Sequence, residues 1–469
     1  MLFSSIPFLY YFLPCVLILY FVVPKCLKNT VLLVLLVFSL FFYAWGEPKY
    51  VLLMAVSITL GYVFGLLIEI WRGTKLSKLF LILSIVTSLG LLGYFKYADF
   101  FIANFNAATG LSVPLLKIAL PIGISFYTFQ ILSYTVDVYR GEVKAQRNYI
   151  SLAAYVALFP QLIAGPIVRY SDIAAQLESR THSFSNVALG TRRFILGLAK
   201  KVLIANALGE LCDIFKESND KSVLFFWLYA IAFTLHIYFD FSGYSDMAIG
   251  LGKIFGFDFL ENFDYPYISG SITEFWRRWH MSLGSWFRDY VYIPLGGNRV
   301  SKARWFLNIF IVWMLTGFWH GAAWNFIVWG LFFAILLIIE KLWLLKPLKK
   351  SKVLSHIYVM FFVIISFVIF NAADMKEVFS YIGGMFGAGG IPFISEEWLY
   401  YLRSYGVVLI VAIIGATPLV KKLVLSVKKK STGEKIMNIA EPIMLVALLL
   451  VITAYLVDGS FNPFLYFRF

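Results

Sequence analysis

Charged side chains are scarce in this sequence: 14% of its 469 residues are Asp, Glu, Lys or Arg, whereas 61% are apolar. Soluble domains are normally about one-quarter charged, so this composition excludes an ordinary soluble globular protein. A helix that crosses a bilayer needs about 20 predominantly apolar residues, because lipid offers the backbone no hydrogen-bonding partners. Eight uncharged runs have roughly this length: residues 29–46, 50–68, 79–95, 118–136, 149–168, 222–239, 353–373 and 404–420. Together with the uncharged first 24 residues, which we interpret as a first transmembrane helix, they predict an all-α polytopic membrane protein. We expect about 11 or more transmembrane helices, with further re-entrant or interfacial helices.

Cysteine is also rare. The three cysteines, Cys15, Cys26 and Cys212, are far apart in the sequence and have no histidine near them. Their spacing excludes a disulfide framework and a zinc cluster. The sequence contains no nucleophile elbow, no phosphate-binding glycine loop and no metal-ligand spacing. We therefore expect neither a bound metal nor a permanently bound cofactor.

Acidic residues are outnumbered, since 40 Lys and Arg against 26 Asp and Glu give a formal net charge of +14. The basic residues cluster between apolar runs, at 25–28, 72–78, 192–201, 299–304, 341–352 and 421–435. Basic loops lie on the cytoplasmic side of a membrane. The pattern predicts a multi-pass protein of the cytoplasmic membrane, and it explains the net charge without any binding of nucleic acid.

The longest uncharged stretch, residues 305–339, contains one histidine, His320. The stretch is too long for a single crossing, and we expect it to break at Gly317–Gly321, where two glycines flank His320. At 1.5 Å per residue, His320 would lie ~22 Å along a helix that begins at Trp305, deep in the membrane. Ionisable residues at such depth usually face a polar cavity. A functional role is favoured over a purely structural hydrogen bond to a neighbouring helix.

A second histidine, His280, lies in a segment that has the pattern of one amphipathic helix. Its apolar stripe consists of Ile272, Trp276, Trp279, Leu283 and Trp286. Its second stripe consists of Thr273, Arg277, His280, Gly284 and Arg288. An interfacial anchor helix whose arginines meet lipid phosphates has the same pattern. Amphipathicity alone therefore leaves both interpretations open.

Residues 240–304 contain charges too frequently for a spanning segment, although they are rich in aromatic residues. We expect this region to lie along the membrane interface or to re-enter the protein interior. His236 and Asp240 are four residues apart just before it, and we interpret them as a structural pair.

Several motifs resemble the membrane-bound O-acyltransferase (MBOAT) family. The matching segments are residues 238–250 (YFDFSGYSDMAIG), Asn262-Phe263 with Pro266, residues 275–290 (FWRRWHMSLGSWFRDY) and residues 317–324 (GFWHGAAW). Residues 3–9, 159–166 and 462–467 are similar to the bacterial branch that O-acetylates alginate. The resemblance is dense over residues 120–340 and extends over nearly the whole chain. We therefore expect a single integral membrane acyltransferase domain, 1–469.

The resemblance implies a helical protein in which funnels from the two faces meet at a central channel. It places the near-universal histidine of the family on His320 and its second, more variable polar position on His280. It also implies transfer of an acetyl or other small acyl group from cytoplasmic acetyl-CoA to a hydroxyl outside. The acceptor would belong to an extracytoplasmic acetyltransferase partner protein or to an exopolysaccharide.

The chemistry of these residues fits that reaction. Attack of a hydroxyl on a thioester requires removal of the hydroxyl proton, and a histidine with a pKa of ~6.5 can contribute roughly 10²–10⁴-fold as the general base. We assign that role to His320, whereas His280 would position the thioester or polarise its carbonyl. Arg277, Arg278 and Arg288 would contact the anionic acyl-CoA, although cytoplasmic topology explains them nearly as well.

Three alternatives remain open. Within the family, the chain could transfer D-alanine to teichoic acid from a carrier-protein thioester. In another class, it could be a transporter of a polar substrate, because broken helices are typical of transporters. The absence of a repeated half, and a polar signal concentrated in residues 240–324, disfavour a transporter. A structural scaffold of a secretion complex is a third interpretation.

Overall fold

The computed structural model describes residues 1–23, 28–162 and 165–459. Within these ranges the regular structure is entirely helical, as predicted. Seven described helices are long and apolar enough to cross a membrane: Pro48–Ile70, Lys75–Thr109, Val223–Ile254, Trp324–Leu348, Lys352–Asn371, Glu396–Gly415 and Ser431–Val457. Phe8–Val22 and Thr30–Gly46 are shorter apolar helices. The expected count of about 11 or more crossings is not confirmed by these helices and stays a prediction.

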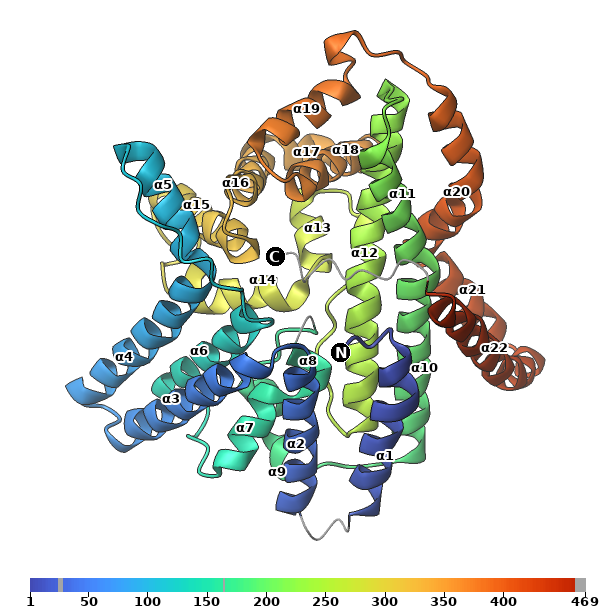
Figure 1. Cartoon of the computed structure of the whole chain (residues 1–469). Coiled ribbons are helices and arrows are strands. Elements are labelled where there is room, and N and C mark those ends of the chain that lie inside the picture. Colours follow the sequence, from blue (N-terminus) through green and yellow to red (C-terminus); the bar gives the residue numbers. More distant parts are fainter. Residues whose placement is uncertain (24–27, 163–164, 460–469) are drawn as a thin grey trace. The chain divides into compact units, whose positions relative to one another are not determined.

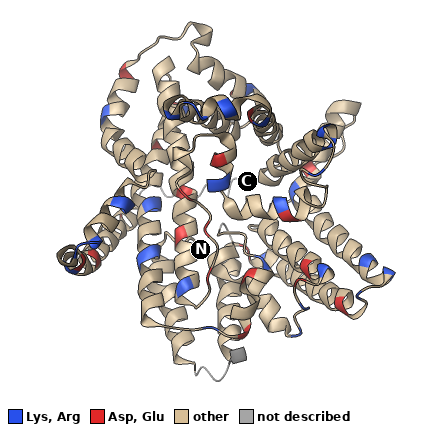
Figure 2. Cartoon of the chain, turned by 180° about the vertical axis from the view of Figure 1, so that it is seen from behind, with Lys and Arg blue, Asp and Glu red and all other residues tan. Residues whose placement is uncertain are grey.

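Charged residues are thinly scattered along the ribbon, as Figure 2 shows. The described residues form two compact units, and a single domain over 1–469 stays a prediction. One unit comprises Met1–Phe194 and Met247–Leu260, and the other comprises Ile195–Asp246 and Glu261–Phe469, of which residues up to 459 are described. Helices α10 (Phe184–Ala199) and α12 (Val223–Ile254) contribute residues to both units.

The core of the first unit forms around α6, which is buried along most of its length. Gly61 and Gly65 of α3 face Ile131 and Tyr134 of α6, and a β-carbon at either glycine would overlap those side chains. The two helices can therefore pack closely. The main helices of this unit are α1 (Leu13–Val22), α2 (Lys28–Gly46), α3 (Val51–Ile70), α4 (Lys75–Leu92), α5 (Ala98–Thr109), α6 (Ile124–Arg140), α7 (Tyr149–Ala157), α8 (Phe159–Leu162) and α9 (Tyr170–Glu178).

The predicted crossing at residues 149–168 is wrong as a single helix. Helix α7 ends at Ala157, Leu158 leaves the helical conformation, and the four-residue helix α8 begins at Phe159. Pro160 is the physical reason, because proline lacks the N–H for a helix-interior hydrogen bond and is tolerated only in a first turn. Residues 163–164 lie outside the described part.

The second unit contains the motifs that carried the resemblance. Its helices are α11 (Asn206–Glu217), α13 (Ile272–Arg278), α14 (Met281–Phe287), α15 (Lys302–His320), α16 (Trp324–Ile339), α17 (Leu345–Leu348), α18 (Lys352–Asn371), α19 (Met375–Met385), α20 (Glu396–Gly415), α21 (Leu419–Lys428) and α22 (Ser431–Val457). Short π-helices η4 (Lys200–Ala205), η6 (Arg288–Tyr292) and η7 (Glu340–Leu344) adjoin them. Much of the core is aromatic, and Trp279, Trp329 and Phe333 are fully or nearly fully buried within it.

Helix α12 continues through Asp240 and Asp246 to Ile254. Residues 240–254 thus continue an apolar helix, although we expected them to lie along the membrane interface or to re-enter the protein interior. Lysines of η4 neutralise the two carboxylates: Lys201 Nζ lies 2.6 Å from Asp240 and Lys200 Nζ lies 2.7 Å from Asp246. His236 interacts electrostatically with Asp240, as expected, and its Nδ1 also bonds to the Ala205 carbonyl at 2.6 Å.

Helices α15 and α16 form an antiparallel hairpin (Figure 1). The uncharged stretch does break, immediately after His320, which is the last residue of α15. Gly317 stays inside the helix, where a β-carbon would lie 2.2 Å from the Phe326 carbonyl oxygen of α16. Glycine is required there because a second backbone approaches closely.

Candidate active site

A cavity of about 560 Å³ lies within the second unit. All five residues of the second stripe line it: Thr273, Arg277, His280, Gly284 and Arg288. One face of α15 forms another wall through Ile309, Val312, Trp313 and Thr316. Leu337 of α16 and Lys341 of η7 complete this part of the lining. The sequence pattern therefore identified one wall of a cavity.

The stripe is not carried by one continuous helix, which corrects the prediction. Helix α13 ends at Arg278, Trp279 is extended, and α14 begins at Met281. Between them His280 has φ 44° and ψ 53°, in the left-handed region. A non-glycine residue held there costs roughly 1–3 kcal/mol and persists only where surrounding contacts impose it.

Asn262 supplies those contacts from a preceding irregular segment. Its carbonyl accepts the Met281 N–H at 3.0 Å. Its side-chain Oδ1 accepts the Ser282 N–H at 3.3 Å and the Ser282 hydroxyl at 2.9 Å, and it lies 3.1 Å from His280 Nδ1. Asn262 thus holds the first residues of α14 and one nitrogen of the imidazole together.

The other ring nitrogen of His280, Nε2, is buried without a hydrogen-bond partner among the described residues. The side chain is 1% exposed, and its ring packs edge-on against Phe241 and Trp319 at centroid distances of 4.7 and 6.0 Å. Burial lowers the pKa of His280 from its ordinary value of 6.5 to about 3. The imidazole is therefore neutral near pH 7.

Three cationic side chains line the same cavity: Arg277, Arg288 and Lys341. Arg288 also binds Asp289 through two contacts of 2.6 and 3.0 Å, and this hydrogen bonding raises its pKa. The lining thus combines these cationic side chains with the aromatic side chains of Trp276 and Trp313.

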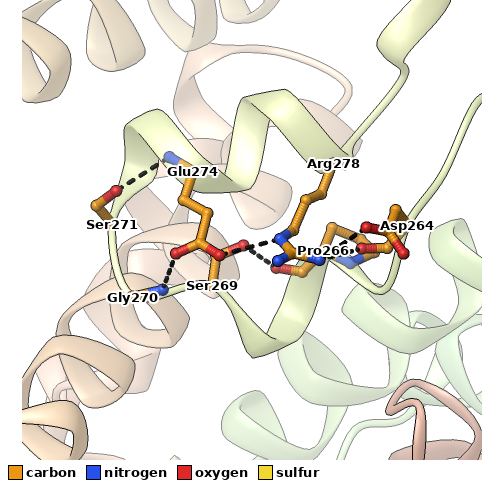
Figure 3. A network of polar contacts seen from close by, with 7 residues as sticks. All are labelled: Asp264, Pro266, Ser269, Gly270, Ser271, Glu274 and Arg278. Atoms are coloured by element: carbon orange, nitrogen blue, oxygen red, sulfur yellow. Dashed lines mark hydrogen bonds and ion pairs between the residues drawn. The ribbon is translucent and has the colours of Figure 1, made fainter.

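Arg278, the third arginine proposed from sequence, is not part of the lining. It bonds to Glu274 at 3.0 Å and to Asp264 at 2.9 Å, as Figure 3 shows. Glu274 in turn accepts the Gly270 N–H at 3.0 Å. Arg278 therefore fastens α13 to the segment that precedes it.

His320 is 6% exposed and lies next to the cavity instead of among its lining residues. Its ring packs against Trp329 and Phe370 at 5.0 and 5.2 Å. Trp329 also packs against the lining residue Trp276 at 5.6 Å. Trp319, adjacent to His320, contacts His280. Trp319 therefore contacts both histidines.

Sequence reasoning missed two residues that position this wall, Asn262 and Glu340. Glu340 is fully buried and caps α13: its carboxylate accepts the N–H of Ile272 and the N–H and hydroxyl of Thr273. A buried carboxylate at a helix N-terminus satisfies otherwise unpaired donors and the helix dipole. Two sequence features could have pointed to them. Asn262 belongs to the motif Asn262-Phe263 with Pro266, and Glu340 directly follows the uncharged stretch 305–339.

Comparison with known proteins supports an enzyme. A profile described as "MBOAT, membrane-bound O-acyltransferase family" matches residues 40–373. "Probable alginate O-acetylase AlgI" of Azotobacter vinelandii is 44% identical over 395 residues, which cover 83% of this chain and 79% of that protein. The peptidoglycan O-acetyltransferase of Helicobacter pylori is 34% identical over 464 residues, which cover 91% and 88%.

A teichoic acid D-alanyltransferase of Bacillus subtilis is 32% identical over 230 residues, which cover 46% of this chain and 58% of that protein. The family profile, by contrast, spans most of this chain, and the two O-acetyl-transfer relatives match over most of their own length. The apolar helices agree with a multi-pass membrane protein. The chain belongs to the membrane-bound O-acyltransferase family and is an O-acyltransferase.

Proposed function

We propose that the protein transfers an acetyl group from cytoplasmic acetyl-CoA across the cytoplasmic membrane to a hydroxyl outside. The acceptor is a polysaccharide or an acetyltransferase partner protein that passes the group to one. The relatives named for alginate and peptidoglycan O-acetylation match most of this chain, which supports an acetyl group and a polysaccharide. The D-alanyltransferase matches less than half of it, so D-alanyl transfer is the alternative.

The cavity beside His280 is the observation that carries this proposal. Acyl-CoA combines phosphates with a long, uncharged arm that ends in the thioester. Arg277, Arg288 and Lys341 offer cations to the phosphates, and arginine suits phosphate because it can donate two parallel hydrogen bonds. The apolar face of α15 offers a surface along which the arm can lie.

The order of residues along the hairpin gives the proposed path a direction. Lys341 begins the basic stretch 341–352, which the positive-inside rule assigns to the cytoplasm. The lining then follows α15 from Ile309 to Thr316. His320 lies one turn beyond Thr316, ~6 Å along the axis. In this proposal the donor enters from the cytoplasmic end, the acceptor approaches from the opposite end of the expected channel, and the two meet near His320.

The proposed reaction forms a bond between the acceptor oxygen and the thioester carbon and breaks the carbon–sulfur bond. His320 takes the hydroxyl proton as attack proceeds and returns it to the departing thiolate, which leaves free CoA. Such general-base help is worth roughly 10²–10⁴-fold. His280 positions the donor, since a neutral imidazole can accept a hydrogen bond from an amide N–H of the arm.

The test is release of free CoA from acetyl-CoA by the purified protein in nanodiscs, with alginate or peptidoglycan oligosaccharides as acceptors. A D-alanyl carrier-protein thioester serves as the comparison donor. We expect turnover of acetyl-CoA that is abolished in His320→Ala and retained in the control His356→Ala, which replaces an exposed histidine. Turnover of the carrier thioester alone would favour the alternative, and full activity of His320→Ala would refute the assigned base.

A further inference from the structure

Asn262 is the hydrogen-bond partner of His280, and it comes from a different segment of the chain. We propose that Asn262 is a positioning residue for acyl transfer, which fixes His280 in the tautomer that carries its proton on Nδ1. Nε2 then has a free lone pair and acts in the site only as an acceptor. The role of this lone pair in acyl transfer rests on the proposed function, whereas the assignment of the tautomer is independent of it.

The orientation of the Asn262 amide follows from its neighbours. A backbone N–H can only donate, and the Ser282 N–H lies 3.3 Å from Oδ1. The amide nitrogen Nδ2 donates to the Ser245 hydroxyl at 3.1 Å. Exchanging the oxygen and nitrogen would place the amide NH₂ against the Ser282 N–H, so that two donors would face each other. The amide oxygen must therefore be the atom that faces His280.

The tautomer follows from the amide. An oxygen cannot donate, so the contact of 3.1 Å between Asn262 Oδ1 and His280 Nδ1 is a hydrogen bond only if Nδ1 carries the proton. In a neutral imidazole the second nitrogen is then an acceptor. Nε2 is also the ring nitrogen for which the described part of the chain provides no hydrogen-bond partner.

Because these side chains are buried, water cannot replace Asn262 as the hydrogen-bond partner of His280 Nδ1. Asn262 and His280 are each 1% exposed, and Ser245 and Ser282 are each 2% exposed. The amide is therefore held on both sides by buried hydroxyls. In other sites, too, a buried partner that accepts a hydrogen bond from one ring nitrogen fixes the tautomer and the orientation of a histidine.

Asn262 also supports the start of α14, so loss of activity on its removal would not separate positioning from folding. Three variants make the distinction. Asn262→Asp keeps an acceptor for Nδ1 and for Ser282. Asn262→Leu has a similar size but no acceptor. Ser245→Ala removes the hydroxyl from the opposite side of the amide and leaves the acceptor oxygen in place.

The direct measurement is nitrogen NMR of the full-length protein with ¹⁵N-labelled histidine, because the shift of each ring nitrogen reports whether it is protonated. The chain has five histidines, and the His280 signals are assigned by their loss in His280→Asn. We expect Nδ1–H in the wild type, in Asn262→Asp and in Ser245→Ala, and a mixture or Nε2–H in Asn262→Leu. A wild-type His280 protonated on Nε2 would overturn the inference whatever the variants do.

Transfer from acetyl-CoA is then measured on the same samples. We expect Asn262→Leu to lose on the order of 10²-fold or more in turnover, with Asn262→Asp restoring most of it. Wild-type turnover in a folded Asn262→Leu with an altered tautomer would contradict the positioning role. If the wild type turned over no thioester, the proposed function would fail while the NMR result still decided the tautomer.

Discussion

Arg277 and Arg278 are adjacent in the sequence but have different surroundings. Arg277 lines the cavity, whereas Arg278 is bonded to Glu274 and Asp264. We predict that Arg277→Gln raises the KM for acetyl-CoA by about tenfold, equivalent to about 1.4 kcal/mol, because one phosphate contact is lost. Arg278→Gln should leave KM within about twofold and lower the unfolding temperature. Steady-state kinetics and thermal unfolding of both variants check this, and equal KM effects would argue against the cavity as the donor site.

His280 should make the stability of the protein depend on pH. Burial holds its pKa at about 3, whereas the unfolded chain has the ordinary value of 6.5. As pH falls below 6.5 the unfolded state binds a proton that the native state does not. The contribution of neutral His280 is therefore fully present above pH 6.5 and is lost progressively towards pH 3.

The matching variant is His280→Asn, because asparagine also tolerates the left-handed conformation that this position requires. We predict that its unfolding temperature falls less than that of the wild type between pH 6.5 and pH 4. His356→Asn, at an exposed position, should keep the wild-type slope. Parallel pH dependence of His280→Asn and wild type would mean that the imidazole is not held neutral by burial.

Helix α13 depends on one carboxylate from a distant element. Glu340 accepts both backbone N–H groups at its start, and Glu340→Ala would leave these buried donors unpaired. An unsatisfied buried donor costs ~1–3 kcal/mol, so we predict a lower unfolding temperature and weaker donor binding, because α13 carries Thr273 and Arg277. Glu434→Ala, at an exposed position on α22, is the control and should change neither. If Glu340→Ala had the same unfolding temperature and donor binding as Glu434→Ala, the Glu340 cap would not stabilise α13.

The hairpin of α15 and α16 depends on its glycines. A β-carbon at Gly317 would lie 2.2 Å from the Phe326 carbonyl oxygen, so Gly317→Ala must separate the two helices and displace His320. We predict a loss of stability in the range of 1–3 kcal/mol that is typical of overpacking, with reduced turnover. Gly406→Ala is the control, because nothing lies within 4 Å of a β-carbon there. Thermal unfolding and CoA release check both, and wild-type behaviour of Gly317→Ala would contradict the close packing.

For the whole molecule, composition was sufficient to predict a helical membrane protein, because lipid leaves the backbone few alternatives. Rules based on local sequence failed where residues far away in the chain determine the extent of a helix. Helix α12 continues through two aspartates because Lys200 and Lys201, more than 30 residues earlier in the chain, neutralise them. The run at 149–168 was predicted to be one span because counting uncharged residues does not take into account that Pro160 interrupts a helix.

The candidate site was predictable in composition but not in geometry. Periodicity correctly grouped five residues of the lining: Thr273, Arg277, His280, Gly284 and Arg288. Helix α13 holds the first two, α14 and η6 hold the last two, and His280 lies at the turn between α13 and α14. The turn at His280 depends on Asn262, 18 residues away, and no local pattern reveals such a contact. The same limit explains why Arg277 and Arg278 could not be told apart from sequence.

The central claim is that acetyl moves from a donor on one side of the membrane to a hydroxyl on the other through a site that contains His320. The most direct test is a sided assay in proteoliposomes, with labelled acetyl-CoA outside and an oligosaccharide acceptor sealed inside, in vesicles whose inserted protein exposes its basic loops outward. We predict labelled O-acetyl ester in the lumen with the wild type and none with His320→Ala. Ester formed only on the donor side, or equal luminal labelling by His320→Ala, would contradict the account.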